Sequence, residues 1–116
     1  MPTLEAGGLS YENIFTRTVV STSTYTATVE DYLLGVRTPN QTCTITLPQI
    51  STITINSYHQ KRYAIVDERG SALTYHIIII PTPPDLIIGQ PEFRLRSNYA
   101  SVYIYNDGGS TWFIGG

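Results

Sequence analysis

The sequence has few charged residues and a single cysteine. The first feature bears on its surface, and the second excludes an internal disulfide. Charged residues make up 14% of the 116 residues, while hydrophobic residues make up 41%. About a quarter of the residues in a globular domain are usually charged, so we expect part of the surface to be hidden between subunits. Because Cys43 is the one cysteine, no internal disulfide can form. Its place in a strand-like run predicts a buried, inert thiol.

The sequence also lacks the features of nucleic-acid-binding, membrane-bound and secreted proteins. The net charge of −2 provides no electrostatic footprint for nucleic acid or for an anionic membrane surface. No apolar stretch approaches the length of a transmembrane helix, so we expect no membrane insertion. The N-terminal residues have neither the basic nor the apolar region of a secretory signal.

The sequence also lacks a credible catalytic or metal-binding group. Glu30-Asp31 and Asp67-Glu68 are paired carboxylates, as glycosidases use. Adjacent residues on a strand point to opposite faces, so we interpret both pairs as solvated turn residues. His59 and His76 have no partner at ligand spacing. We therefore predict no enzyme activity, no cofactor and no metal.

What the sequence does have is β-forming residues. Thr, Ile, Tyr and Val dominate and favour a pleated sheet. We expect strands near residues 17–29, 32–37, 42–47, 62–67, 74–80, 86–89, 92–96, 101–105 and 111–114, with a further candidate at 50–56. Short strands with turns about every 8–12 residues indicate a sandwich or barrel. The expected fold is an all-β, antiparallel, jelly-roll-like β-sandwich: an irregular segment at 1–16 and one β domain at 17–116.

The C-terminal residues predict a hairpin. Val102 and Ile104 alternate with polar and aromatic residues, which is the period of a half-buried strand. Asn106–Gly109 then forms a turn cluster that tolerates positive φ. We expect Asp107-Gly108 at the tip of this hairpin and Trp112 packed inward.

This hairpin resembles the end of a small β domain found in bacteriophage tail fibres and other virion appendages. Thr44–Pro48, with the sequence Thr-Ile-Thr-Leu-Pro, matches a motif of that family residue for residue. The similarity covers roughly residues 25–114 and extends over further segments, which are Tyr25–Val29, Asp31–Val36, Tyr63–Ala72, His76–Pro81, Asp85–Gly89 and Asn98–Val102. The chain departs from the family at Gln60–Arg62, where a glycine usually stands, and in a longer segment at Ile50–Tyr58.

The resemblance implies a virion structural protein, made in the host cytoplasm and located in the virion. It would be a homotrimeric fibre, spike or head-type module for particle assembly and host attachment. Its partners would be its own copies, other virion proteins and a host-surface glycan. An alternative is a carbohydrate-binding module of a larger enzyme or adhesin, whose tyrosines and Trp112 would form an exposed row. We favour core and interface roles for these aromatics.

The Ile77–Ile80 run suggests where subunits meet. Its side chains are apolar on both faces, although strands of this kind are normally covered on both sides. We expect one face to pack on the second sheet and the other on a second copy. The predicted subunit interface therefore comprises Ile77, Ile78, Ile79 and Ile80.

The strand faces are thereby committed to core and interface, so we expect ligands to bind at loops on one end of the trimer. The candidate loops are 38–41, 57–60 and 82–85. The residues that we predict to bind are Thr38, Asn40, Gln41, Ser57, Tyr58, His59, Thr82 and Asp85.

Overall fold

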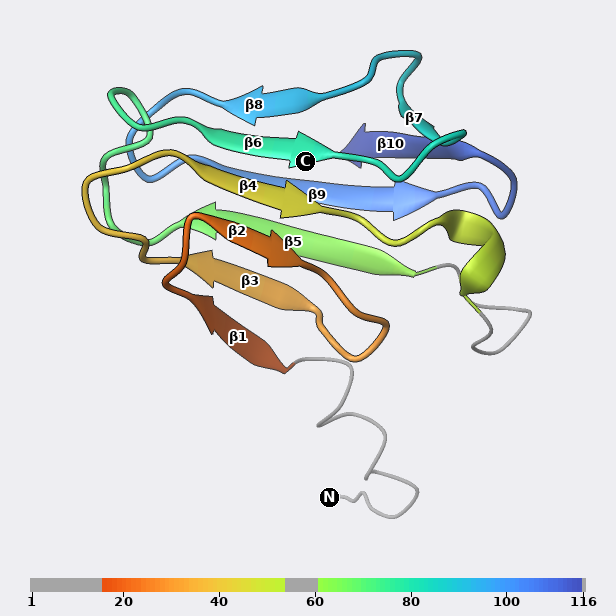
Figure 1. The fold of residues 1–116 in the computed structure, drawn as a ribbon, viewed down its shortest axis with the longest axis horizontal. Helices are drawn as coiled ribbons and strands as arrows, with labels where there is room; N and C mark the ends of the chain where they lie inside the picture. Colours follow the sequence, from red (N-terminus) through yellow and green to blue (C-terminus); the bar gives the residue numbers. More distant parts are fainter. Residues whose placement is uncertain (1–15, 54–60, 116) are drawn as a thin grey trace.

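The computed structural model describes residues 16–53 and 61–115, which form two packed β-sheets (Figure 1). Apart from η1, a short 3-10 helix at Ile50–Thr52, every regular element in these residues is a strand. The strands are β1 (Arg17–Val20), β2 (Thr24–Thr26), β3 (Leu33–Val36), β4 (Cys43–Thr46), β5 (Arg62–Asp67), β6 (Ile77–Ile80), β7 (Leu86–Ile87), β8 (Phe93–Leu95), β9 (Ser101–Asn106) and β10 (Thr111–Gly115). The expected all-β fold is confirmed.

The first six strands alternate between the two sheets. β1, β3 and β5 are parallel neighbours in a six-stranded sheet. β2, β4 and β6 are parallel neighbours in a four-stranded sheet. The chain therefore winds as successive two-strand coils, each adding one strand to each sheet (Figure 1).

The expected antiparallel, jelly-roll-like arrangement is therefore wrong. Parallel neighbours need a crossover connection, which is usually a helix. Here a strand of the opposite sheet lies within each crossover. Because the sequence has no helical segments that could serve as crossovers, it predicted antiparallel sheets. Short strands, however, can pair in either direction.

The C-terminal strands add antiparallel pairs. β9 pairs with β5 and with β10, and β8 pairs with β6, while β7 is a short parallel edge beside β10. The predicted turn joins β9 to β10, with Gly108 at a φ of 81°. Asn106 Oδ1 accepts the N–H of Gly108 at 2.8 Å, and Asp107 Oδ1 accepts that of Gly109 at 2.8 Å. The hairpin prediction is confirmed.

The hydrophobic core lies between the sheets. Trp112 and Tyr63 are fully buried there, and their ring centroids lie 5.9 Å apart. Trp112 packs inward, as predicted. Cys43 is also buried, as predicted, and its burial raises the pKa of the thiol.

The isoleucine run forms β6, in which the side chains alternate. Ile77 and Ile79 are fully buried, while Ile78 and Ile80 are half-buried on the outer face. The interface prediction is wrong for Ile77 and Ile79, because both side chains are already enclosed by their own chain. An apolar run can supply one residue in two to the core and leave the others outside. For Ile78 and Ile80 the interface stays a prediction.

The expected strand at 17–29 is divided in the structure. β1 ends at Val20 and β2 begins at Thr24, because the chain crosses here from one sheet to the other. β-forming residues continue through this corner, so composition does not mark it. η1 replaces the start of the candidate strand at 50–56. The rest of that strand and nearly all of the segment at 1–16 lie outside the described residues.

Candidate binding surfaces

In the predicted binding loop at 38–41, Thr38 is buried in the fold, whereas Asn40 and Gln41 are exposed. Thr38 is fully buried, and its hydroxyl donates to the carbonyl of Thr22 at 2.6 Å. It thereby fastens the corner between β1 and β2, and is not available to a ligand. Asn40 and Gln41 are exposed, and Asn40 has a φ of 51°.

The loop at 82–85 is also tied into the fold. Asp85 is buried, and its carboxylate accepts the backbone N–H of Ile50 at 2.7 Å. The hydroxyl of Thr82 donates to the carbonyl of Leu47 at 2.8 Å. The ligand role predicted for Asp85 is therefore wrong, because its carboxylate holds η1 in place. Ser57, Tyr58 and His59 lie outside the described residues.

The candidate loops do not gather at one end. The loop at 38–41 joins β3 to β4, whereas the loop at 82–85 follows β6, which runs parallel to β4. The two loops therefore lie at opposite ends of the sheets (Figure 1). This corrects the expectation that both loops lie at one end of the molecule.

Asp67 is fully buried at the end of β5, although the sequence suggested a solvated turn residue. Its carboxylate accepts the backbone N–H groups of Ala72 at 2.8 Å and Tyr99 at 3.0 Å, and the Nε of Arg69 at 3.1 Å. Burial alone would raise the pKa of Asp67, but these donors outweigh it and lower the pKa. Arg69 in turn donates to the carbonyls of Thr38, Gln41 and Tyr75.

Asp31 is the corresponding buried carboxylate just before β3. It accepts hydrogen bonds from the hydroxyls of Thr18 at 2.7 Å and Tyr25 at 2.8 Å, and from the backbone N–H of Thr28 at 2.9 Å. Burial acts to raise the pKa of Asp31, and these bonds more than offset it. Burial and the bond to Asp31 together raise the pKa of Tyr25 to about 12.

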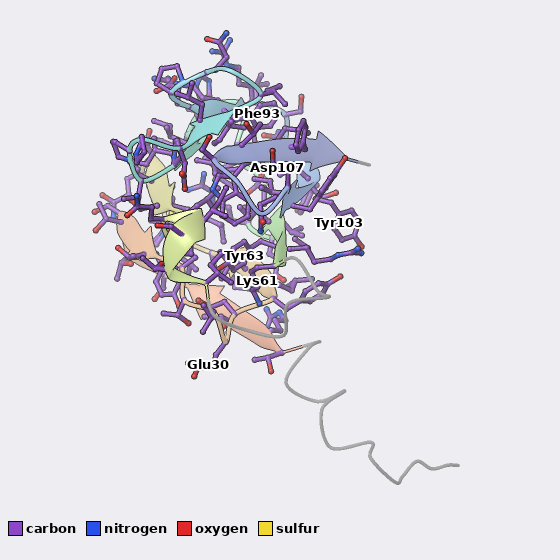
Figure 2. All side chains as sticks on the ribbon, turned by 90° about the vertical axis from the view of Figure 1, so that its right-hand side faces the viewer. Glu30, Lys61, Tyr63, Phe93, Tyr103 and Asp107 are labelled. Carbon is purple, nitrogen blue, oxygen red and sulfur yellow. The ribbon has the colours of Figure 1, made fainter. Side chains whose placement is uncertain are left out.

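Lys61 is buried beside the Asp31 cluster, and Figure 2 shows it next to Tyr63. Its Nζ donates to the backbone carbonyl of Asp31 and lies 4.9 Å from the centroid of the Tyr63 ring. Burial lowers the pKa of Lys61, while Asp31 and Glu30 oppose this shift. These contacts join β5 to the start of β3, so we assign Lys61 and Asp31 a structural role.

Exposed aromatic side chains occur on the outer face of the six-stranded sheet. Tyr103 and Tyr105 of β9 are 49% and 44% exposed, and Figure 2 shows Tyr103 projecting from this side. Phe113 of β10 pairs with Tyr105, and the two rings stack with centroids 5.6 Å apart. Arg62 of β5 pairs with Tyr105 from the other side. These four residues form what we call the aromatic face.

A pocket of about 230 Å³ opens in the aromatic face. Its lining consists of Arg62, Tyr103, Ile104, Tyr105 and Gly115. Gly115 pairs with Tyr103, and a Cβ at Gly115 would lie 3.4 Å from the ring of Tyr105. The missing side chain of Gly115 therefore keeps this space open.

Two polar groups border the pocket. The hydroxyl of Tyr103 shares a hydrogen bond with Tyr32, and burial together with this bond raises the pKa of Tyr32. Arg62 is exposed, and within residues 16–53 and 61–115 no carboxylate forms an ion pair with it. The pocket thus combines aromatic walls with a cation that is free to pair.

The outer face of the four-stranded sheet is different in character. Thr24, Thr44 and Ile78 align across β2, β4 and β6, and a second row of the same composition runs beside them. We call the six residues of the two rows the Thr/Ile face: Thr24, Thr26, Thr44, Thr46, Ile78 and Ile80. No charged residue lies within these rows; the nearest in register is Arg94 of β8, which pairs with Glu92.

Neither surface carries a metal-binding group: no cluster of His, Cys, Asp and Glu in the described parts of the chain could hold a metal ion. Within the same parts, no helix is long and apolar enough to cross a membrane. Comparison with known proteins finds no family model and no curated protein that matches the chain. The resemblance to virion appendages therefore stays a prediction.

The sequence raised an exposed row of tyrosines and Trp112 only as an alternative, and the structure buries Trp112 while it leaves Tyr103 and Tyr105 exposed. The alternation of Tyr103 and Tyr105 with Val102 and Ile104 did signal that one set points outward. What it could not supply was the neighbouring strands. Only the register places Arg62 and Phe113 on either side of Tyr105.

Proposed function

We propose that the chain is a non-catalytic structural module that assembles as a homotrimer in a virion appendage, such as a fibre or spike. The observation that carries this proposal is the Thr/Ile face. It is uncharged and regular, and it contains the outward side chains of the isoleucine run. The assignment to a virus particle rests on the sequence motifs that resemble those of virion appendages.

The assembly contact that we propose lies on β2, β4 and β6. Ile78 and Ile80 are already half-buried in the single chain and lack a covering layer from the described residues. Burying them against the same face of other copies removes apolar area from water. Each Å² of apolar area buried in this way stabilises the assembly by about 25 cal/mol. The low overall charge of 14% agrees with surface hidden in this way.

The test is sedimentation velocity on the parent and on Ile78→Lys. We expect a trimeric mass for the parent and a monomer, or insoluble protein, for the variant, because an interface would bury an unpaired charge. Ser101→Lys is the matched control, since Ser101 is an exposed strand residue on the opposite sheet. A monomeric parent at micromolar concentration would refute the trimer. So would an Ile78→Lys variant with the mass of the parent.

A second candidate function, carbohydrate binding, is favoured by the aromatic face. Such binding needs exposed rings next to polar groups, because one face of a sugar ring is apolar while its edge carries hydroxyls. Tyr103, Tyr105 and Arg62 meet this requirement around one pocket. The two functions are compatible: the Thr/Ile face and the aromatic face lie on opposite sheets, so a trimer closed on the first leaves the second in solvent.

A further inference from the structure

We propose that the pocket in the aromatic face binds the acidic sugar residue of a saccharide. This inference deepens the carbohydrate-binding candidate and rests on it. It adds the chemical class of the ligand and assigns a role to each side of the pocket. Tyr105 provides the stacking surface, Arg62 pairs with the ligand carboxylate, and Tyr103 binds a ring hydroxyl.

The aromatic surface is fixed in place before any ligand arrives. The ring of Tyr105 stacks on that of Phe113, with an interplanar angle of 25°. The hydroxyl of Tyr103 interacts with that of Tyr32. Groups that are already ordered lose little conformational entropy on binding. The pocket volume of about 230 Å³ is below the roughly 300–1,000 Å³ of pockets for drug-sized ligands, so we expect it to take one sugar residue and not a longer saccharide.

The charge of Arg62 selects an acidic sugar over a neutral one. Four of the other arginines are already paired, namely Arg17, Arg37, Arg69 and Arg94. Arg62 keeps its guanidinium exposed at the pocket, and that planar fork matches a carboxylate with two parallel hydrogen bonds.

No carboxylate of the described residues, Asp107 included, forms an ion pair with Arg62. Asp107 lies in the hairpin beyond Tyr105, and its carboxylate already accepts the N–H groups of Gly109 at 2.8 Å and Thr111 at 3.3 Å. A nucleic acid could also stack on the rings, but its backbone needs a basic track. The net charge of −2 is unsuited to that.

The experiment is isothermal titration calorimetry of the full chain with two matched probe pairs. The first pair is sialyllactose and lactose, and the second is an oligogalacturonate and its methyl ester. We expect binding of at least one acid and little or none of its neutral partner. Arg62→Gln should weaken acid binding by roughly tenfold or more, as expected for a lost charge-assisted hydrogen bond. Tyr105→Ala and Gly115→Val should abolish binding by removing the stacking surface and by filling the pocket.

Arg96→Gln and Tyr99→Ala are the matched controls, since both residues are exposed and neither lines the pocket. They should bind like the parent. Equal binding of acid and neutral probe would overturn the acidic class, and binding that survives Tyr105→Ala and Gly115→Val would overturn the site. No binding of either acid would overturn the inference as a whole.

Sedimentation of the same samples separates this inference from the trimer. A trimer that binds neither acid leaves the assembly proposal standing and refutes the pocket. A monomer that binds an acid, with the expected effects of the variants, refutes the trimer and leaves the pocket standing. If Tyr105→Ala lowers the mass of the assembly, a second copy occupies the aromatic face and the saccharide site is refuted.

Discussion

Asp67 organises three separate turns through one carboxylate. It holds Ala72 after β5, Tyr99 before β9, and Arg69, whose other donors reach the loop at 38–41. The sequence placed Asp67 in a turn but could not show that it is buried. Its partners are up to 32 residues away in the chain, and a short motif carries no information about them.

We expect Asp67→Asn to destabilise the fold by about 3–5 kcal/mol, the usual cost of leaving one partner of a buried ion pair alone. The amide would leave Arg69 without its counter-charge, and its NH2 group would face either Arg69 Nε or the backbone N–H groups of Ala72 and Tyr99. Urea unfolding monitored by circular dichroism measures this loss. Asp107→Asn is the control, because an exposed turn asparagine still accepts the same N–H bonds, so its change should stay within about 0.5 kcal/mol. Equal losses in both variants would contradict the assigned role of Asp67.

The sequence predicted the β9–β10 hairpin to within one residue at each strand, because its signals are local. The strand periodicity and the Asp107-Gly108 turn both lie within sixteen residues. The strand at 62–67 was likewise predicted with its observed bounds. What the sequence could not supply was the pairing. Thr24 and Thr44 lie side by side only because the chain passes through the other sheet between them.

Gly108→Val tests the hairpin directly. Gly108 has a φ of 81°, a region in which a β-branched residue is strained by about 1–3 kcal/mol. We expect the melting temperature to fall accordingly. Gly109→Ala is the matched control: Gly109 has no positive φ, and an added Cβ would meet Asp107 Oδ1 at 3.3 Å, which a small shift relieves. A hairpin that tolerates valine at Gly108 as well as alanine at Gly109 would show that the turn differs from the one described.

For the whole molecule, the two buried carboxylate clusters predict loss of stability in acid. Asp31 and Asp67 have lowered pKa values, and Glu68 has one too, chiefly through its hydrogen bond with Arg17. In the unfolded chain these groups titrate near pH 4. Because their folded-state pKa values are lower, their contribution is present above about pH 4. It is lost as the pH falls through the folded-state values.

Thermal melts between neutral pH and about pH 2.5 should therefore show a nearly constant midpoint down to about pH 5 and a decline below about pH 4. Asp67→Asn removes one of the titrating groups, so its decline should be shallower than that of the parent. A parent midpoint that rises on acidification would refute the role assigned to these carboxylates.

The parallel coils also set the order in which the chain can fold. Among the strand pairs of the described residues, β9 and β10 alone are consecutive in the sequence. That pair can form in about 1–10 μs, as isolated hairpins do. Every other pair must first close a longer loop, and chains dominated by such contacts fold in about milliseconds to seconds. During synthesis, β6 is completed before β8 and β9 exist, so Ile77 and Ile79 lack part of their final surroundings until the last strands arrive, while Ile78 and Ile80 stay on the outer face. The slow closing of these long loops therefore coincides with the period in which the inward isoleucines of β6 are incompletely buried.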